Sequence, residues 1–78
     1  MNIEIVTPDT VIFEGEASLA QLPGIDGSFE ILNNHAPLIS VLKAGTVKII
    51  VPDKSTKTFE IKGGVVEMHR NKLLILAE

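Results

Sequence analysis

The chain has 78 residues, 45% of them hydrophobic and 22% charged, which suits one small folded domain and leaves no room for two. Cysteine is absent, which excludes disulfides and cysteine zinc sites, and no run of about 18 apolar residues is present to form a transmembrane helix. The net charge is −3, and the first residues lack the basic start of a secretory signal, so we expect a cytosolic compartment.

The charges are unevenly divided along the chain. Six acidic residues and no Lys or Arg occur up to Leu42, whereas seven basic and four acidic residues follow from Lys43 onward. This division indicates either an interaction surface or, as we favour, strands of the two halves that pair and cancel their charges. No basic cluster with interleaved aromatic residues is present, so the sequence does not predict nucleic-acid binding.

Alternating apolar and polar residues predict β-strands along the whole chain, and their β-branched content favours strands over helices. In chain order the alternating apolar residues are Ile3 and Ile5; Val11 and Phe13; Phe29 and Ile31; Val47, Ile49 and Val51; Phe59 and Ile61; and Val66 and Met68.

Turn-forming residues separate these segments. They are Thr7-Pro8-Asp9, Gly15, Pro23 to Gly27, Lys43-Ala44-Gly45, Pro52 to Ser55, Gly63-Gly64, which fits a bend or bulge, and Arg70-Asn71. About nine short strands result, so we expect a single all-β domain over residues 1–78, an antiparallel β-sandwich or flattened barrel.

Two predicted strands, Leu38–Leu42 and Leu73–Leu76, are apolar on both faces. A strand of a thin sandwich normally has one wet face. Either these strands are central and covered by the chain ends, or their second face meets another protein. The second interpretation predicts an exposed apolar patch on the isolated domain.

Residue patterns for enzyme chemistry are missing. The sequence has no nucleophile elbow and no phosphate-binding loop, and His35 and His69 lie 34 positions apart without a further metal-ligand pattern. His35 is either an ordinary turn residue or a polar contact on a binding loop, and His69 is expected to be exposed beside a hairpin turn. We therefore expect no catalytic residue, no cofactor and no metal.

The middle of the chain carries a more specific pattern. The segment from Leu22 to Gly45, LPGIDGSFEILNNHAPLISVLKAG, combines PGxxGxF with HAPLI, and Gly63-Gly64 follows before an apolar strand. Over essentially the whole chain this combination resembles the N-terminal β-sandwich domain of the epsilon subunit of F-type ATP synthases. The helical C-terminal domain of typical bacterial members is not part of this sequence. Glu30 stands where members commonly have Gly, and Asn33-Asn34 where they have Pro-Gly.

The resemblance implies a ten-stranded sandwich in a non-catalytic subunit of the central stalk, or rotor. Such a subunit binds the gamma subunit and the c-ring, contacts the catalytic alpha/beta head indirectly, and lies peripherally at the cytoplasmic face of the bacterial inner membrane. By motif position, the residues implied to face the c-ring are Asp26, Gly27, Ser28, Glu30, Asn33, Asn34 and His35, and those implied to face gamma are His35, Ser40 and Leu42.

One alternative belongs to another class of protein. The turn Val51-Pro52-Asp53-Lys54-Ser55 resembles the hairpin of lipoyl and biotinyl carrier domains, which hold their cofactor on a lysine. Lys54 would then be the modified residue, although Asp-Lys-Ser is also good turn chemistry.

Overall fold

The computed structural model describes residues 1–78 and contains seven β-strands and no helix. The strands are β1 (Asn2–Val6), β2 (Val11–Glu16), β3 (Leu19–Gly24), β4 (Gly27–Leu32), β5 (Leu38–Ile50), β6 (Thr56–His69) and β7 (Lys72–Ala77). They form one sheet in the order β2-β1-β7-β6-β5-β3-β4.

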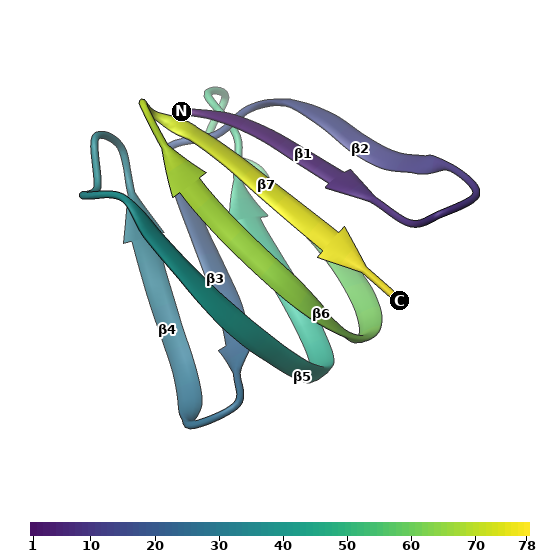
Figure 1. Cartoon of the computed structure of the whole chain (residues 1–78). Coiled ribbons are helices and arrows are strands. Elements are labelled where there is room, and N and C mark those ends of the chain that lie inside the picture. Colours follow the sequence, from purple (N-terminus) through teal and green to yellow (C-terminus); the bar gives the residue numbers. More distant parts are fainter.

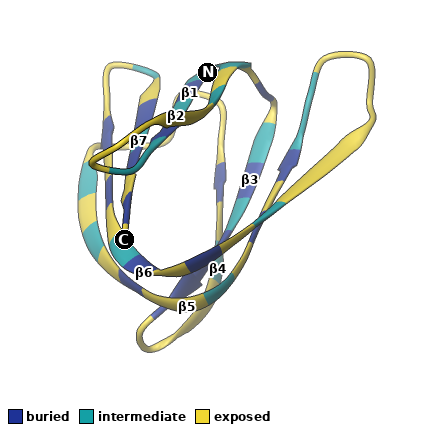
Figure 2. Ribbon diagram, turned by 90° about the vertical axis from the view of Figure 1, so that its right-hand side faces the viewer, coloured by how far each residue is buried: buried dark blue, intermediate teal, exposed yellow.

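The sheet curls into two layers because its two longest strands run through both (Figure 1). The second half of β6 and the first half of β5 pair with each other beside β7, and β1 and β2 complete that layer. The first half of β6 and the second half of β5 belong to the other layer, with β3 and β4. In Figure 2, β1, β2 and β7 lie on one side of the curled sheet and β3 on the other.

The expected number of nine to ten strands was wrong, because two of the predicted breaks are bends inside continuous strands. Lys43 pairs with Gly63 and Gly45 with Ile61, so strand pairing continues past both glycine-containing segments. Gly63 and Gly64 have φ angles of 139° and 152°, which glycine adopts without a Cβ penalty. The chain bends there, as expected of Gly63-Gly64, but it does not end a strand.

A fully antiparallel arrangement was also wrong at one position. β1 pairs in parallel with β7 over five residues, from Asn2 opposite Lys72 to Val6 opposite Leu76. This pairing places the first and last strands of the chain side by side within one layer. All the other strand pairs are antiparallel.

The core lies between the layers and is entirely apolar. Sixteen buried hydrophobic residues form one cluster, and no polar or charged side chain is buried. The alternating residues of the strands supply it, as Ile3 and Ile5 do on β1 and Leu73 and Ile75 on β7. Phe13 of β2 packs on Phe59 of β6 with ring centroids 5.5 Å apart, which fixes the edge strand against the opposite layer.

Candidate functional site

The turn between β3 and β4 forms one end of the molecule. Pro23 and Gly24 are buried, whereas Ile25 and Asp26 at the tip are exposed. A Cβ at Gly24 would lie 2.6 Å from the carbonyl oxygen of Gly27, so only glycine allows the two strands to approach this closely. Asp26, Gly27 and Ser28 are therefore presented together at a rigid, exposed tip.

The loop between β4 and β5 lies at the opposite end. Asn34 has a φ of 63°, and its N–H donates to Oδ1 of Asn71 in the β6–β7 turn at 2.7 Å. The side-chain oxygen of Asn33 accepts a hydrogen bond from the amino group of Met1. The N–H of His35 donates to the carbonyl of Leu32 at 3.2 Å, and its imidazole is exposed. These bonds tie the loop to both the chain start and the neighbouring hairpin.

The residues expected to face the c-ring are consequently divided between two ends of one strand. Asp26, Gly27 and Ser28 lie at the start of β4, whereas Asn33, Asn34 and His35 follow its end (Figure 1). Four extended residues lie between the two groups, so Ser28 and Asn33 are roughly 17 Å apart along the strand. Glu30 is exposed on β4 between them, so the complete set describes a long side of the molecule and not one tip.

The residues expected to face gamma also differ in their exposure. His35 is exposed and Ser40 is half-buried, but Leu42 is only 3% exposed and belongs to the core cluster. Leu38, Ser40 and Leu42 share the inward side of β5, whereas Ile39 and Val41 point outward. A partner that docks on the outer face of β5 would contact Ile39 and Val41. Leu42 packs in the core on the opposite side of the strand.

An apolar patch crosses the outer face of one layer, as the second of the two interpretations of the apolar strands predicts. Val41 lies opposite Val65, Val65 opposite Leu76, Leu76 opposite Val6, and Val6 opposite Val11, so an apolar row crosses five strands of one layer. Four of these five residues are exposed, and Ile39, two residues before Val41, is the most exposed large hydrophobic residue at 74%. The predicted apolar patch on the isolated domain is confirmed.

Two carboxylates lie directly opposite each other beside this row. Glu14 of β2 pairs with Glu4 of β1. A side-chain hydrogen bond with Glu4 and the charge of that residue raise the pKa of Glu14, against a smaller lowering by Lys72. The one ion pair in the structure joins the amino group of Met1 to Glu16 at 3.5 Å. The expected cancellation between acidic and basic halves is therefore not made by direct side-chain pairing.

The hairpin with Lys54 is an ordinary tight turn. Lys54 has a φ of 71°, its N–H donates to the carbonyl of Val51 at 2.8 Å, and Asp53 accepts a hydrogen bond from the N–H of Ser55 at 2.8 Å. Hydrogen bonds from the side chain and backbone of Ser55 lower the pKa of Asp53. Asp-Lys-Ser thus accounts for the turn by its own hydrogen bonds.

No group of three or more His, Asp or Glu side chains is arranged to hold a metal ion. The structure also contains no helix that could span a membrane.

The sequence matches one class of protein over the full chain. Residues 1–78 fit the family model of the ATP synthase delta/epsilon chain β-sandwich domain, and the chain belongs to this family. It is 43% identical over 77 residues to the ATP synthase epsilon chain of Chlorobium limicola, covering 99% of this chain and 88% of that relative. The epsilon chain of Caulobacter vibrioides is 39% identical over 79 residues, with 100% and 90% covered. That of Sulfurimonas denitrificans is 42% identical over 78 residues, with 100% and 60% covered.

Solved structures show the same fold. A chain of the Euglena gracilis mitochondrial ATP synthase (OSCP/F1/c-ring, rotational state 1) superposes with a TM-score of 0.90 at 16% identity, covering 96% of this chain and 48% of that one. A chain of the Tetrahymena thermophila mitochondrial ATP synthase central stalk and c-ring gives 0.80 at 24% identity, covering 97% and 61%. The expected family is confirmed, and the carrier-domain alternative at Lys54 is not supported.

Proposed function

We propose that this chain is a non-catalytic central-stalk subunit of an F-type ATP synthase, which binds the gamma subunit and the c-ring and helps to couple ion flow to ATP synthesis. The observation that carries the proposal is the full-length match to ATP synthase epsilon chains, at 43% identity with 88% of the Chlorobium limicola relative covered. The solved neighbours are parts of ATP synthase assemblies, one of them described as central stalk and c-ring.

The architecture suits a part that transmits force between partners. The strands β5 and β6 continue from one layer to the other. One layer therefore cannot slide over the other unless these two strands bend. The chain makes 47 backbone hydrogen bonds, of which 38 lie within its strands. A densely packed domain with no buried polar side chain resists deformation better than a loop does.

Within this role, the exposed tip at Asp26, Gly27 and Ser28, with Glu30 beside it on β4, is assigned to the c-ring. Its carboxylates complement basic loops of the ring, and such pairing sets position and association rate more than total affinity. Asn33, Asn34 and His35, at the opposite end of β4, complete the set assigned to the c-ring side. His35, together with Ser40 and the buried Leu42 of β5, is assigned to the side that faces gamma. The subunit then lies peripherally at the cytoplasmic face of the bacterial plasma membrane, and contacts the alpha/beta head only through its partners.

The assignment of the tip is tested by binding to a gamma–c-ring subcomplex of the same organism at low salt. Asp26→Lys combined with Glu30→Lys should weaken binding several-fold, with the difference decreasing as salt is added because exposed charges are screened. Asp9→Lys, an equally exposed acidic turn residue between β1 and β2, is the matched control. Equal binding by all three proteins would remove the tip from the ring contact, and failure of the unmodified chain to bind would contradict the central-stalk role itself.

A further inference from the structure

The tip between β3 and β4 carries one large apolar side chain beside its acidic residue. Ile25 is 60% exposed and stands directly before Asp26. The turn does not require an isoleucine there, because Ile25 has no positive φ and Asn, Asp or Ser are the usual residues of a tight turn. Packing does not require it either, since Ile25 belongs neither to the core cluster nor to the half-buried residues packed on it. Its side chain is therefore available for a contact outside the chain.

The backbone of the tip is fixed against β5. The N–H of Ile25 donates to the carbonyl of Val41 at 3.1 Å. A Cβ at Gly45 would lie 2.9 Å from the Cβ of Pro23, so the bend of β5 packs closely against the base of the tip. A side chain presented by a fixed backbone loses less conformational freedom when a partner covers it.

The same hydrogen bond sets Ile25 beside the apolar row of the outer face. Gly24 lies opposite Leu42, and the bond to Val41 continues this antiparallel pairing by one residue. Ile25 therefore lies opposite Val41, and the side chains of directly opposite residues share one face of a sheet. Both side chains are at least half exposed.

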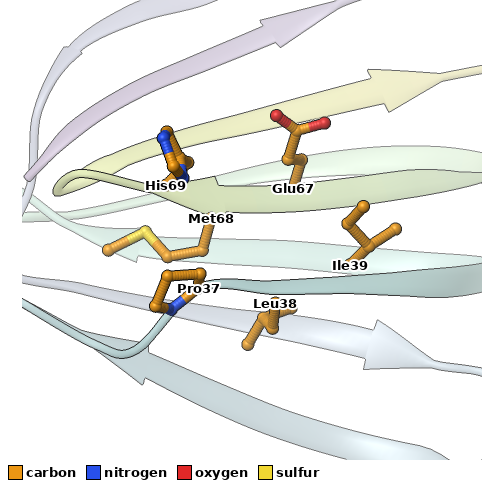
Figure 3. Close-up of a pocket in the computed structure, with 6 residues that line it drawn as sticks. All are labelled: Pro37, Leu38, Ile39, Glu67, Met68 and His69. Atoms are coloured by element: carbon orange, nitrogen blue, oxygen red, sulfur yellow. The ribbon is translucent and has the colours of Figure 1, made fainter.

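The face that they share is the outer one. In Figure 3, Ile39 and Glu67 point to one side of the paired strands β5 and β6, whereas Leu38 and Met68 point to the other. Met68 is buried in the core, so Ile39 points outward, and Val41, two residues further along β5, points the same way. The apolar row of the outer face thus continues through Val41 to the tip.

Carboxylates border this end of the row. Asp26 follows Ile25 at the tip, and Glu30 is exposed on β4. An apolar centre with a charged rim is the usual anatomy of a protein contact, in which the covered apolar side chain supplies affinity and the charges set orientation. The tip has both parts within a few residues.

We propose that Ile25 is the apolar anchor of the contact with the c-ring, packing against apolar side chains of the exposed loop of a c subunit, with Val41 at the border of the same contact. The c subunit is the partner because Ile25 and Asp26 are neighbours at one tip, so the protein that meets the carboxylate also covers the isoleucine. This inference rests on the proposed assignment of the tip to the c-ring, and it adds a residue whose contribution does not depend on charge.

The test compares Ile25→Ser with Asp26→Lys for binding to the purified gamma–c-ring subcomplex of the same organism, at low and at high salt. Ile25→Ser should weaken binding about tenfold at both, as expected when an exposed isoleucine side chain is no longer covered by a partner. The effect of Asp26→Lys should decrease as salt is added, because exposed charges are screened. Urea unfolding of Ile25→Ser should match that of the unmodified chain, since the side chain is exposed.

Val11→Ser is the matched control. Val11 is 58% exposed and lies at the other end of the apolar row, roughly 24 Å from Ile25 at the usual spacing of strands. Its substitution should leave binding within about twofold of the unmodified chain. Equal weakening by Ile25→Ser and Val11→Ser would overturn the inference, because the row as a whole, and not the tip, would then carry the contact.

A cross-link identifies the partner that covers the tip. The chain contains no cysteine, so Ile25→Cys introduces its only thiol, to which a photoactivated cross-linker is attached before assembly with the subcomplex. Illumination should join this position to a c subunit, as mass spectrometry of the product will show, whereas Val11→Cys should give no such product. A product with gamma alone, or none in a formed complex, would overturn the inference and leave the central-stalk function standing. If the unmodified chain does not bind the subcomplex, both the function and the inference are contradicted.

Discussion

Among the six glycines, Gly64 leaves the least room for a side chain, and the effect of Gly64→Ala on stability tests this. Gly64 lies in the middle of the sheet, paired with Leu42 of β5 on one side and Ala77 of β7 on the other. Its φ is 152°, and an added Cβ would lie 2.2 Å from the carbonyl oxygen of Leu76 and 3.1 Å from the Cα of Ala77. Both obstacles are backbone atoms, so no side-chain rotation can relieve them.

The expected loss is large relative to the stability of the domain. Holding alanine in a glycine-only conformation costs about 1–3 kcal/mol. Displacing β7 by enough to admit the methyl group costs a further amount of about 1–3 kcal/mol, as overpacked sites do. A domain of this size has a free energy of unfolding of roughly 4–12 kcal/mol, so Gly64→Ala should lose at least about a sixth of it, and at the upper end of the cost it should fail to fold at 37 °C.

Gly27→Ala separates the two contributions. Gly27 has a φ of 131°, but no atom lies within 4 Å of an added Cβ. Gly27→Ala should therefore lose only the conformational part. Its free energy of unfolding, measured with urea, should exceed that of Gly64→Ala by at least about 1 kcal/mol. If the two variants unfold at the same urea concentration with equal slopes, the close contact between β6 and β7 does not limit the fold, and the argument fails.

Three smaller effects follow from individual contacts. Because the opposing carboxylate of Glu4 raises the pKa of Glu14 above the reference value of 4.5, its contribution to stability is present at low pH and is lost as pH rises through the raised pKa. Glu14→Gln should therefore be more stable than the unmodified chain at pH 7 and should lose that advantage at pH 4; a constant difference would contradict this. Asp53 has a lowered pKa, so its hairpin should loosen only as pH falls below the reference value of 3.8, which the chemical shifts of the turn amides will report. Removing Phe13 and Phe59 singly and together should give a coupling of about 0.5–1.5 kcal/mol for the ring pair, and additive losses would show that the rings do not interact.

Local turn chemistry was predictable from sequence because it depends on few neighbouring residues. Pro52 to Ser55 and Arg70-Asn71 form the expected turns, the latter with φ angles of 50° and 59°. In the sequence, Gly45 and Gly64 resemble glycines that end a strand. In the structure they lie within bent, continuous strands, because the pairing of β5 with β6 continues past them. Strand pairing is non-local, so a glycine that bends a strand and one that ends it carry the same local signal.

The sequence predicted an apolar strand at the candidate site but not which of its side chains are exposed. The run Leu38 to Leu42 is apolar at four of its five positions, so its pattern does not tell which alternate residues point inward. The structure places Leu42 in the core and leaves Ile39 at the surface. The unpaired edge at the start of β5 is likewise not readable from the sequence, because it depends on where β3 stops pairing with that strand.

The most direct test of the central claim is affinity purification of the tagged chain from its native membranes in mild detergent, with mass spectrometry of the retained proteins. The account predicts gamma, the c subunit and the catalytic-head subunits in stoichiometric amounts, with no added mass on Lys54. Recovery of the chain alone, or with partners unrelated to ATP synthase, would contradict it.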